Sequence, residues 1–287
     1  MDALYHYCSV STFHSIIQSR SIRLSSLTLS NDTMEGKLVA KAITRLAERD
    51  GLGNKTILRL QELLTSLESL VDGLGFCLSE EGDLLSQWRG YAADATGVSI
   101  GFSHAYLQQF SASSKNSGKP GFSLDRVKYT LAGHESKVEP IYQRMRKHID
   151  NGAFSLVGLR GLLDTRSETE IDEERNRIKE TFSKLLLTTL ELFPLLFHLK
   201  AYAFNEEKEW RLVSFFTGNE NEECFYRTSS DRIIPCRSYD LISADQPVIK
   251  EVVLGPKRHT PPTIVKSFLK KNGFGDVTVR RSEASYR

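Results

Sequence analysis

The chain has 287 residues, of which 40% are hydrophobic and 26% are charged, so it has enough apolar side chains to bury a core and is not a disordered chain. Its 38 Lys and Arg residues against 36 Asp and Glu residues give a net charge of +2. That balance excludes a strong overall field for nucleic acid or for an anionic membrane.

Short strand patterns at both ends of the chain enclose a helical middle. In the N-terminal part we expect a strand at 4–8, a helix at 12–18, a strand at 21–27, helices at about 34–49 and 57–71, a strand at 74–79, a helix at 83–92 and strands at 97–102 and 127–130. A helical stretch follows from 134 to 200. In the C-terminal part we expect strands at 209–216, 224–227, 233–240 and 249–256, a helix at 263–272 and a strand at 276–282.

This order predicts an α+β fold rather than strict strand–helix alternation. We expect a mixed or antiparallel split sheet that is built from the N- and C-terminal segments and carries a helical insert. The prediction is a single α+β domain over residues 1–287, with helical elaborations at about 33–71 and 134–200.

The chain lacks the common metal-binding and nucleotide-binding motifs. Cys8, Cys77, Cys224 and Cys236 form no C-x-x-C or zinc-type spacing. Neither a G-x-G-x-x-G motif nor a P-loop is present. We therefore expect a reduced protein without a metal site. The opening MDALYHYCSV has no basic segment followed by an apolar one, so we expect no signal peptide and a cytoplasmic location.

The most apolar run lies at residues 185–200 and contains Glu191 and Pro194. It is shorter than the roughly 20 apolar residues that a membrane-spanning helix needs. We expect a buried helix kinked at the proline, and no membrane partner.

Three carboxylates precede a hydrophobic run in the stretch NEEKEWRLVSFF, residues 205–216. On a strand, Glu207, Glu209 and Arg211 share one face, and Trp210 and Leu212 share the other, which we expect to be core. Two interpretations follow from this pattern. The carboxylates form an ion-pair cluster with Arg211, which is the commoner case, or they are catalytic.

Several short motifs, taken together, resemble those of a family of uncharacterised bacterial proteins. Its members typically open with L-Y-H-Y-T-S and carry S-Q-W-R, E-x-E-W-R and L-G-P-K. The corresponding stretches here are LYHYCS, SQWR, EKEWR and LGPK, in the same order from end to end. The chain departs from the pattern at Cys8, where threonine is usual.

The chain also resembles the ADP-ribosyltransferase superfamily, in its early strand with a histidine and its late E-x-E before a hydrophobic strand. This resemblance implies that His6 holds NAD, that Glu209 is catalytic and that Glu207 occupies the position two residues before it. Ser25 and Ser26 stand where the superfamily has a tyrosine. His6 and Glu209 would then lie in one cleft.

The implied reaction cleaves NAD, as substrate, at its nicotinamide bond. Nicotinamide leaves as a neutral group, so the main need is a carboxylate that stabilises an oxocarbenium-like sugar. Tyr7 or Trp88 would stack on a ring of NAD, and Arg89 would pair with its pyrophosphate. The acceptor stays open between a protein, a nucleic acid, a small molecule and water.

Two other functions stay open. In the first, the same residues serve as core and ion pairs in a non-catalytic binding or regulatory module. In the second, Asp32, Glu35 and Glu209 surround Mg²⁺ in a nuclease or phosphate-transfer enzyme.

Overall fold

The structure is a computed structural model that describes residues 2–29, 36–114, 120–157, 166–218, 223–229, 231–241 and 247–286. The chain forms two compact units. The sheet unit comprises residues 1–31, 72–127 and 202–287, and the helical unit comprises 32–71 and 128–201. The helical stretches expected at about 33–71 and 134–200 fall in the helical unit, whereas the single domain stays a prediction.

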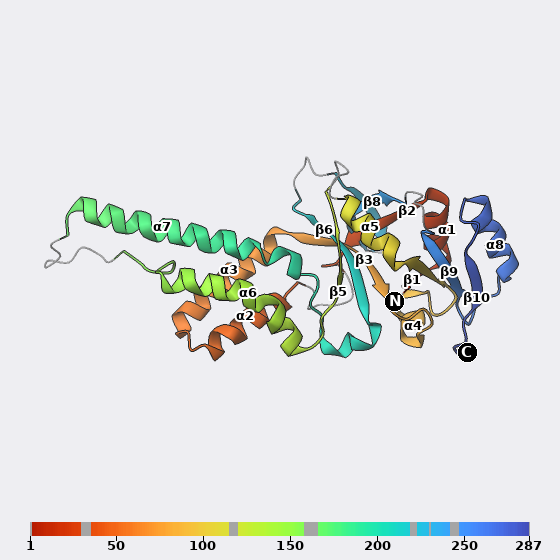
Figure 1. Cartoon of the computed structure of the whole chain (residues 1–287), viewed down its shortest axis with the longest axis horizontal. Coiled ribbons are helices and arrows are strands. Elements are labelled where there is room, and N and C mark those ends of the chain that lie inside the picture. Colours follow the sequence, from red (N-terminus) through yellow and green to blue (C-terminus); the bar gives the residue numbers. More distant parts are fainter. Residues whose placement is uncertain are drawn as a thin grey trace. The chain divides into compact units, whose positions relative to one another are not determined.

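The strands that the structure describes all belong to the sheet unit (Figure 1). They are β1 Ala3–Cys8, β2 Ser21–Ser26, β3 Asp72–Ser79, β4 Val98–Ser103, β5 Ser123–Arg126, β6 Glu209–Phe216, β7 Phe225–Ser229, β8 Arg232–Asp240, β9 Ile249–Leu254 and β10 Thr278–Arg281. The helices of this unit are α1 Val10–Ser19, α4 Leu85–Tyr91, α5 His104–Ser114, the 3₁₀ helix η2 Tyr202–Glu207, and α8 Pro262–Lys271.

The strands form one mixed, mostly antiparallel sheet in the order β10-β9-β4-β1-β3-β2-β8-β7, and among the described strand pairs β9 and β10 are the parallel one. Strand β6 pairs with β3 along its whole length and carries β5 on its other edge. On its opposite edge, β3 pairs with β2 at Leu74 and Gly75 and with β1 at Ser79. The sheet therefore splits along β3, and the α+β prediction is confirmed.

One face of the sheet packs into the main hydrophobic core. Because strand side chains alternate, Leu4 of β1, Phe76 of β3 and Leu212 of β6 point to this face. Trp210 packs against the same core, as its spacing in β6 predicts. The other face carries a smaller apolar cluster around Tyr7 and Trp88, and polar side chains beside it.

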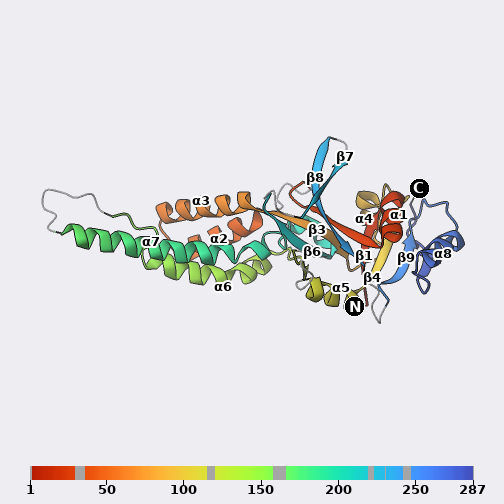
Figure 2. The ribbon, with the colours of Figure 1, turned by 90° about the horizontal axis from the view of Figure 1, so that it is seen from above.

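The helical unit contains α2 Leu38–Arg49, α3 Asn54–Leu70, α6 Leu131–Asp150, α7 Glu168–Leu190 and the 3₁₀ helix η1 Phe193–Leu195. Figure 2 shows α6 and α7 running side by side. Several ion pairs join α2 and the residue that follows it to α6. Arg45 lies 3.0 Å from Glu135, and Arg146 of α6 lies 2.6 Å from Asp50, the residue after α2.

The proline-kinked helix expected over residues 185–200 is wrong. Helix α7 ends at Leu190, and Pro194 lies in the first turn of η1. Proline lacks the N–H group that would continue a helix, and it fits a first turn. None of the helices that the structure describes has the length and apolar character to cross a membrane.

Candidate functional site

A row of aligned residues crosses five strands on the polar face of the sheet. The strand registers place Glu251, Gly101, Tyr5, Ser79 and Glu209 opposite one another in β9, β4, β1, β3 and β6. Directly opposite residues of antiparallel strands project to the same face. A carboxylate therefore lies at each end of the row, and two hydroxyl groups lie between them.

Glu209 is buried and paired with Arg211 on the same strand. The Nε and Nη2 atoms of Arg211 donate to the two oxygens of Glu209, at 2.7 and 3.0 Å. The side chains of Arg211 and Glu209 are only 2% and 6% exposed. A two-point pair of this kind fixes the orientation of the carboxylate. The ion pair is thus present, as the first interpretation of this stretch predicts.

Glu207 lies just before β6, in η2, and not on the strand as its spacing suggested. Lys208, between the two glutamates, has a positive φ of 43°, which breaks the strand pattern. The hydroxyl of Tyr91 donates to Oε1 of Glu207 at 3.0 Å, and Ser79 Oγ donates to its main-chain oxygen at 2.7 Å. Glu207 is 8% exposed and Tyr91 is 43% exposed, so an accessible aromatic ring adjoins a buried carboxylate.

His6 points to the opposite face of the sheet from Glu209. It neighbours Tyr5 on β1, so strand alternation turns it toward the core. Its ring stacks on Phe76 at 4.0 Å, and Nδ1 lies 2.8 Å from the oxygen of Cys77. Burial lowers the pKa of His6 to about 4, against an opposing effect of the hydrogen bond to Cys77. The structure therefore does not bring His6 and Glu209 together in one cleft.

The low pKa of His6 predicts a loss of stability in mild acid. Below pH 6.5 the unfolded chain protonates this residue, whereas the folded chain keeps it neutral until about pH 4. The free energy of unfolding should fall as the pH drops through this window, by about 2 kcal/mol between pH 7 and pH 5. Urea unfolding at both pH values should show that the loss largely disappears in His6→Gln. It should persist in His259→Gln, which changes an exposed histidine; equal losses in both variants would contradict the assignment.

Tyr7 and Trp88 pack against each other and not toward a ligand. Their ring centroids are 4.9 Å apart with the planes at 79°, and the two residues are 5% and 0% exposed. Trp88 Nε1 donates to Asp83 at 2.7 Å, and the Tyr7 hydroxyl donates to the main-chain oxygen of Glu81 at 2.7 Å. Both polar ends are therefore satisfied internally, and neither ring is accessible for stacking on NAD.

Arg89 is exposed and lies away from the glutamates. It precedes Tyr91 by two residues on α4, a separation that places the two side chains on opposite sides of a helix. Its guanidinium lies 5.8 Å from the ring of Tyr286, whereas Tyr91 contacts Glu207. The structure therefore separates this predicted pyrophosphate ligand from the carboxylates.

Asp83 organises this region and was missed in the sequence. It accepts hydrogen bonds from Trp88 Nε1 at 2.7 Å, Ser282 Oγ at 2.5 Å and the N–H of Glu283 at 2.7 Å. Burial alone would raise the pKa of Asp83, but these bonds outweigh it and lower the pKa. Tyr286 donates to Asp94 at 2.7 Å. Residues 282–286 are therefore hydrogen-bonded both to Asp83, which precedes α4 in the sequence, and to Asp94, which follows it. The C-terminal stretch SEASYR, residues 282–287, was the available signal in the sequence.

A second group at the far end of the polar row was also missed. The Tyr5 hydroxyl donates to Glu251 Oε1 at 2.5 Å, and Arg280 Nε donates to Oε2 at 2.9 Å. Burial, with the adjacent Glu251, raises the pKa of Tyr5 to about 12. Gly101 leaves room for the ring, since a Cβ there would lie 2.9 Å from Tyr5 Cε1. Tyr5 is thus a hydrogen-bond donor that stays protonated at neutral pH.

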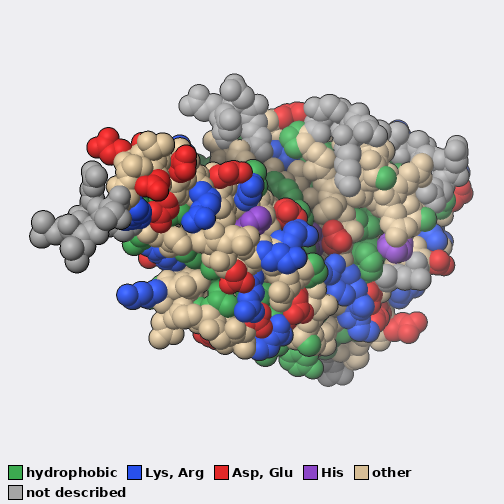
Figure 3. Space-filling view, turned by 60° about the vertical axis from the view of Figure 1, so that its left-hand side comes forward, with side chains coloured by type: hydrophobic (Ala, Val, Ile, Leu, Met, Phe, Trp, Pro, Cys, Tyr) green, Lys and Arg blue, Asp and Glu red, His purple; other side chains and the backbone are tan. Residues whose placement is uncertain are grey.

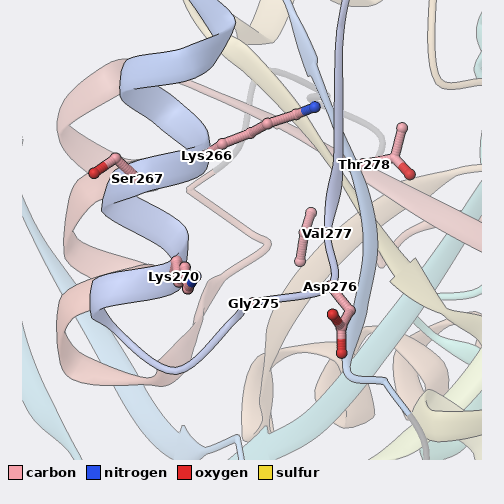
Figure 4. A pocket seen from close by; sticks show the side chains of 7 residues that line it. All are labelled: Lys266, Ser267, Lys270, Gly275, Asp276, Val277 and Thr278. Atoms are coloured by element: carbon pink, nitrogen blue, oxygen red, sulfur yellow. The ribbon is translucent and has the colours of Figure 1, made fainter.

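The described residues hold no metal cluster at the predicted site, and one pocket lies away from that site. Within the described parts of the chain, no three His, Cys, Asp or Glu side chains are grouped to hold a metal ion. Asp32 and Glu35, two of the three proposed Mg²⁺ ligands, lie outside the described residues. An open pocket between α8 and β10, lined by Lys266, Lys270 and Asp276 among others, includes none of the predicted residues (Figure 4). On the face drawn in Figure 3, basic and acidic side chains are interspersed.

A family model matches part of the chain. Residues 87–212 match the model of a family described as a protein of unknown function, DUF2971. The matched segment runs from α4 to the middle of β6, and so contains Trp88, Glu207 and Glu209. No curated protein and no solved structure matches the chain. The chain is thus similar, over less than half of its length, to an uncharacterised domain family.

Proposed function

We propose that this chain transfers ADP-ribose from NAD, or hydrolyses NAD, at the cluster formed by Glu207, Glu209 and Tyr91. The observation that carries the proposal is the contact between the exposed Tyr91 and the buried Glu207, at 3.0 Å. An accessible aromatic ring can stack on nicotinamide, and a carboxylate beside it can stabilise positive charge on the adjacent ribose.

In this reaction, the bond between ribose C1′ and the nicotinamide nitrogen breaks. Both electrons of that bond leave with nicotinamide, which becomes neutral. The acceptor, or water, forms the new bond to C1′ and loses a proton. The carboxylate therefore acts on a sugar that carries positive charge in the transition state, as in glycoside hydrolysis.

The contacts suggest different roles for the two glutamates. Both oxygens of Glu209 accept hydrogen bonds from Arg211, so this carboxylate is held in place and partly neutralised. Glu207 has an oxygen beside the exposed ring of Tyr91. We therefore assign the charge-stabilising role to Glu207, and we assign to Glu209 the role of fixing the start of β6. His6 and Arg89 have no part in this assignment.

Turnover of labelled NAD by the purified protein, with and without cell extract, tests the proposal. Glu207→Gln keeps the side-chain volume and removes the charge, so turnover should fall by about 10²-fold or more. Glu48→Gln makes the same change at an exposed position of α2 and should have no effect. Undetectable turnover by the unmodified chain, or full turnover by both Glu207→Gln and Glu209→Gln, would refute the proposal. A loss confined to Glu209→Gln would return the catalytic role to Glu209.

One observation favours the non-catalytic module as a second candidate. The three aromatic rings that were expected to hold NAD, those of His6, Tyr7 and Trp88, instead contact other side chains of the chain. Calorimetric titration separates the two functions. An enzyme of the proposed kind binds NAD and turns it over, whereas this module would leave NAD intact in every variant.

A further inference from the structure

A basic loop after β9 is fixed against the turn that follows α4. The N–H groups of Gly255 and Lys257 donate to the main-chain oxygens of Gly97 and Ala95, each at 3.1 Å. Nη1 of Arg258 donates to the oxygen of Thr96, between them, at 3.3 Å. Three consecutive carbonyl groups thus accept hydrogen bonds from one loop, which holds Arg258 in a defined position.

The turn beneath this loop has an unusual backbone. Ala93, Asp94 and Ala95 have φ values of 49°, 50° and 68°, so three successive residues other than glycine are left-handed. Such residues persist only where the surrounding structure fixes them. The loop fits closely here, because a Cβ on Gly255 would lie 2.4 Å from the oxygen of Ala95. The turn and the loop therefore form a rigid base.

Arg258 has a donor that nothing in the described chain satisfies. Its Nε atom is buried and has no hydrogen-bond partner there. Lys257, by contrast, lies 2.9 Å from Asp94 and 4.0 Å from the ring centre of Tyr286. Burial lowers the pKa of Arg258, and no described carboxylate offsets this effect. An unpaired buried donor is destabilising, so an acceptor at this place would be stabilising.

The side chain of a second arginine contacts the main chain of the first. Nη1 of Arg281, the last residue of β10, donates to the main-chain oxygen of Arg258 at 3.0 Å. Arg281 is exposed and forms no ion pair with any carboxylate of the described chain. Two guanidinium groups without carboxylate partners are thus held at one corner of the sheet unit, where β9 and β10 end.

We propose that Arg258 and Arg281 form a binding site for a phosphate group. The planar fork of a guanidinium matches the oxygens of a phosphate, and two such groups compensate its charge. Because Nε of Arg258 is buried, binding would involve a shift of this side chain that lets a phosphate oxygen accept the unsatisfied N–H. This site uses none of the residues assigned to NAD cleavage, so it goes beyond the proposed function and stands or fails independently of it.

Calorimetric titration with inorganic phosphate, and separately with a nucleoside diphosphate, tests the site and distinguishes a free from an attached phosphate group. Saturable binding of at least one probe is expected. Arg258→Gln should weaken binding at least about tenfold, because it removes a charged hydrogen-bonding group. Arg281→Gln should weaken it in the same direction.

Arg232→Gln is the matched control, since this half-exposed arginine of β8 already pairs with Asp231 at 3.6 Å. It should bind as tightly as the unmodified chain. If Arg258→Gln fails to fold, the exposed Arg281→Gln decides the outcome alone. The proposal is overturned if neither probe saturates, or if the arginine variants bind as the control does, which would indicate an adventitious ion only.

Discussion

Replacing Arg211 with methionine is expected to lower the free energy of unfolding by about 3–5 kcal/mol, because a buried carboxylate would lose its cation. The side chains of Arg211 and Glu209 are 2% and 6% exposed, so water cannot easily take over the role of the guanidinium. Methionine fills a similar volume, so the loss reports the charge more than a cavity. Urea denaturation of the variant measures it.

Two further variants test the cause. Removing both charges, in Glu209→Leu with Arg211→Met, should recover most of the lost stability, since replacing a whole buried pair is often neutral. Arg232→Met breaks a half-exposed pair and should change the free energy by about 1 kcal/mol or less. If Arg211→Met changes the free energy of unfolding as little as Arg232→Met does, the pair is solvated and Glu209 is available for a catalytic role. A large loss, restored in the double variant, would leave Glu209 in a structural role.

Strand periodicity correctly predicted the sides of β6. Trp210 and Leu212 face the core and Glu209 and Arg211 face away, because alternation is a local property of an extended backbone. Glu207 falls outside this pattern because the left-handed Lys208 ends the strand, and a lysine gives no sequence signal for that conformation.

The relative orientation of distant strands could not be predicted in the same way. His6 and Glu209 each sit on an expected strand, but their faces depend on how β1, β3 and β6 are registered, which long-range pairing decides. Asp83 was missed for a similar reason. It looks like an ordinary loop residue until the segment at Ser282, 199 positions away in sequence, folds back onto it.

The start of α7 shows a local limit of sequence patterns. Residues 160–174 mix charges without apolar periodicity, which predicts a loop or a mobile surface segment. Residues 160–165 lie outside the described residues, and α7 begins at Glu168. Ser167 and Glu170 form a capping box there, so reciprocal capping and not an apolar stripe starts this helix. The capping pattern could have been read from the sequence.

Replacing Trp88 with alanine is expected to lower the free energy of unfolding by about 3–5 kcal/mol, the usual range for a large buried aromatic side chain. Trp88 is fully buried, and its loss would leave a cavity beside Tyr7 and remove one hydrogen-bond donor from Asp83. The matched control is Tyr202→Ala, because Tyr202 is an aromatic residue that is 67% exposed and should contribute about 0.5 kcal/mol or less.

Measuring unfolding and NAD binding on the same Trp88 variants separates a core residue from a ligand-stacking residue. Trp88→Phe keeps an aromatic ring but cannot donate to Asp83, so it should lose less stability than Trp88→Ala and more than the exposed control. A core role predicts that NAD affinity in the folded fraction of Trp88→Phe is unchanged. If Trp88→Phe instead unfolds like the unmodified chain while NAD affinity falls at least about tenfold, the indole stacks on the ligand. The tryptophan would then have to leave its position against Tyr7 when NAD binds.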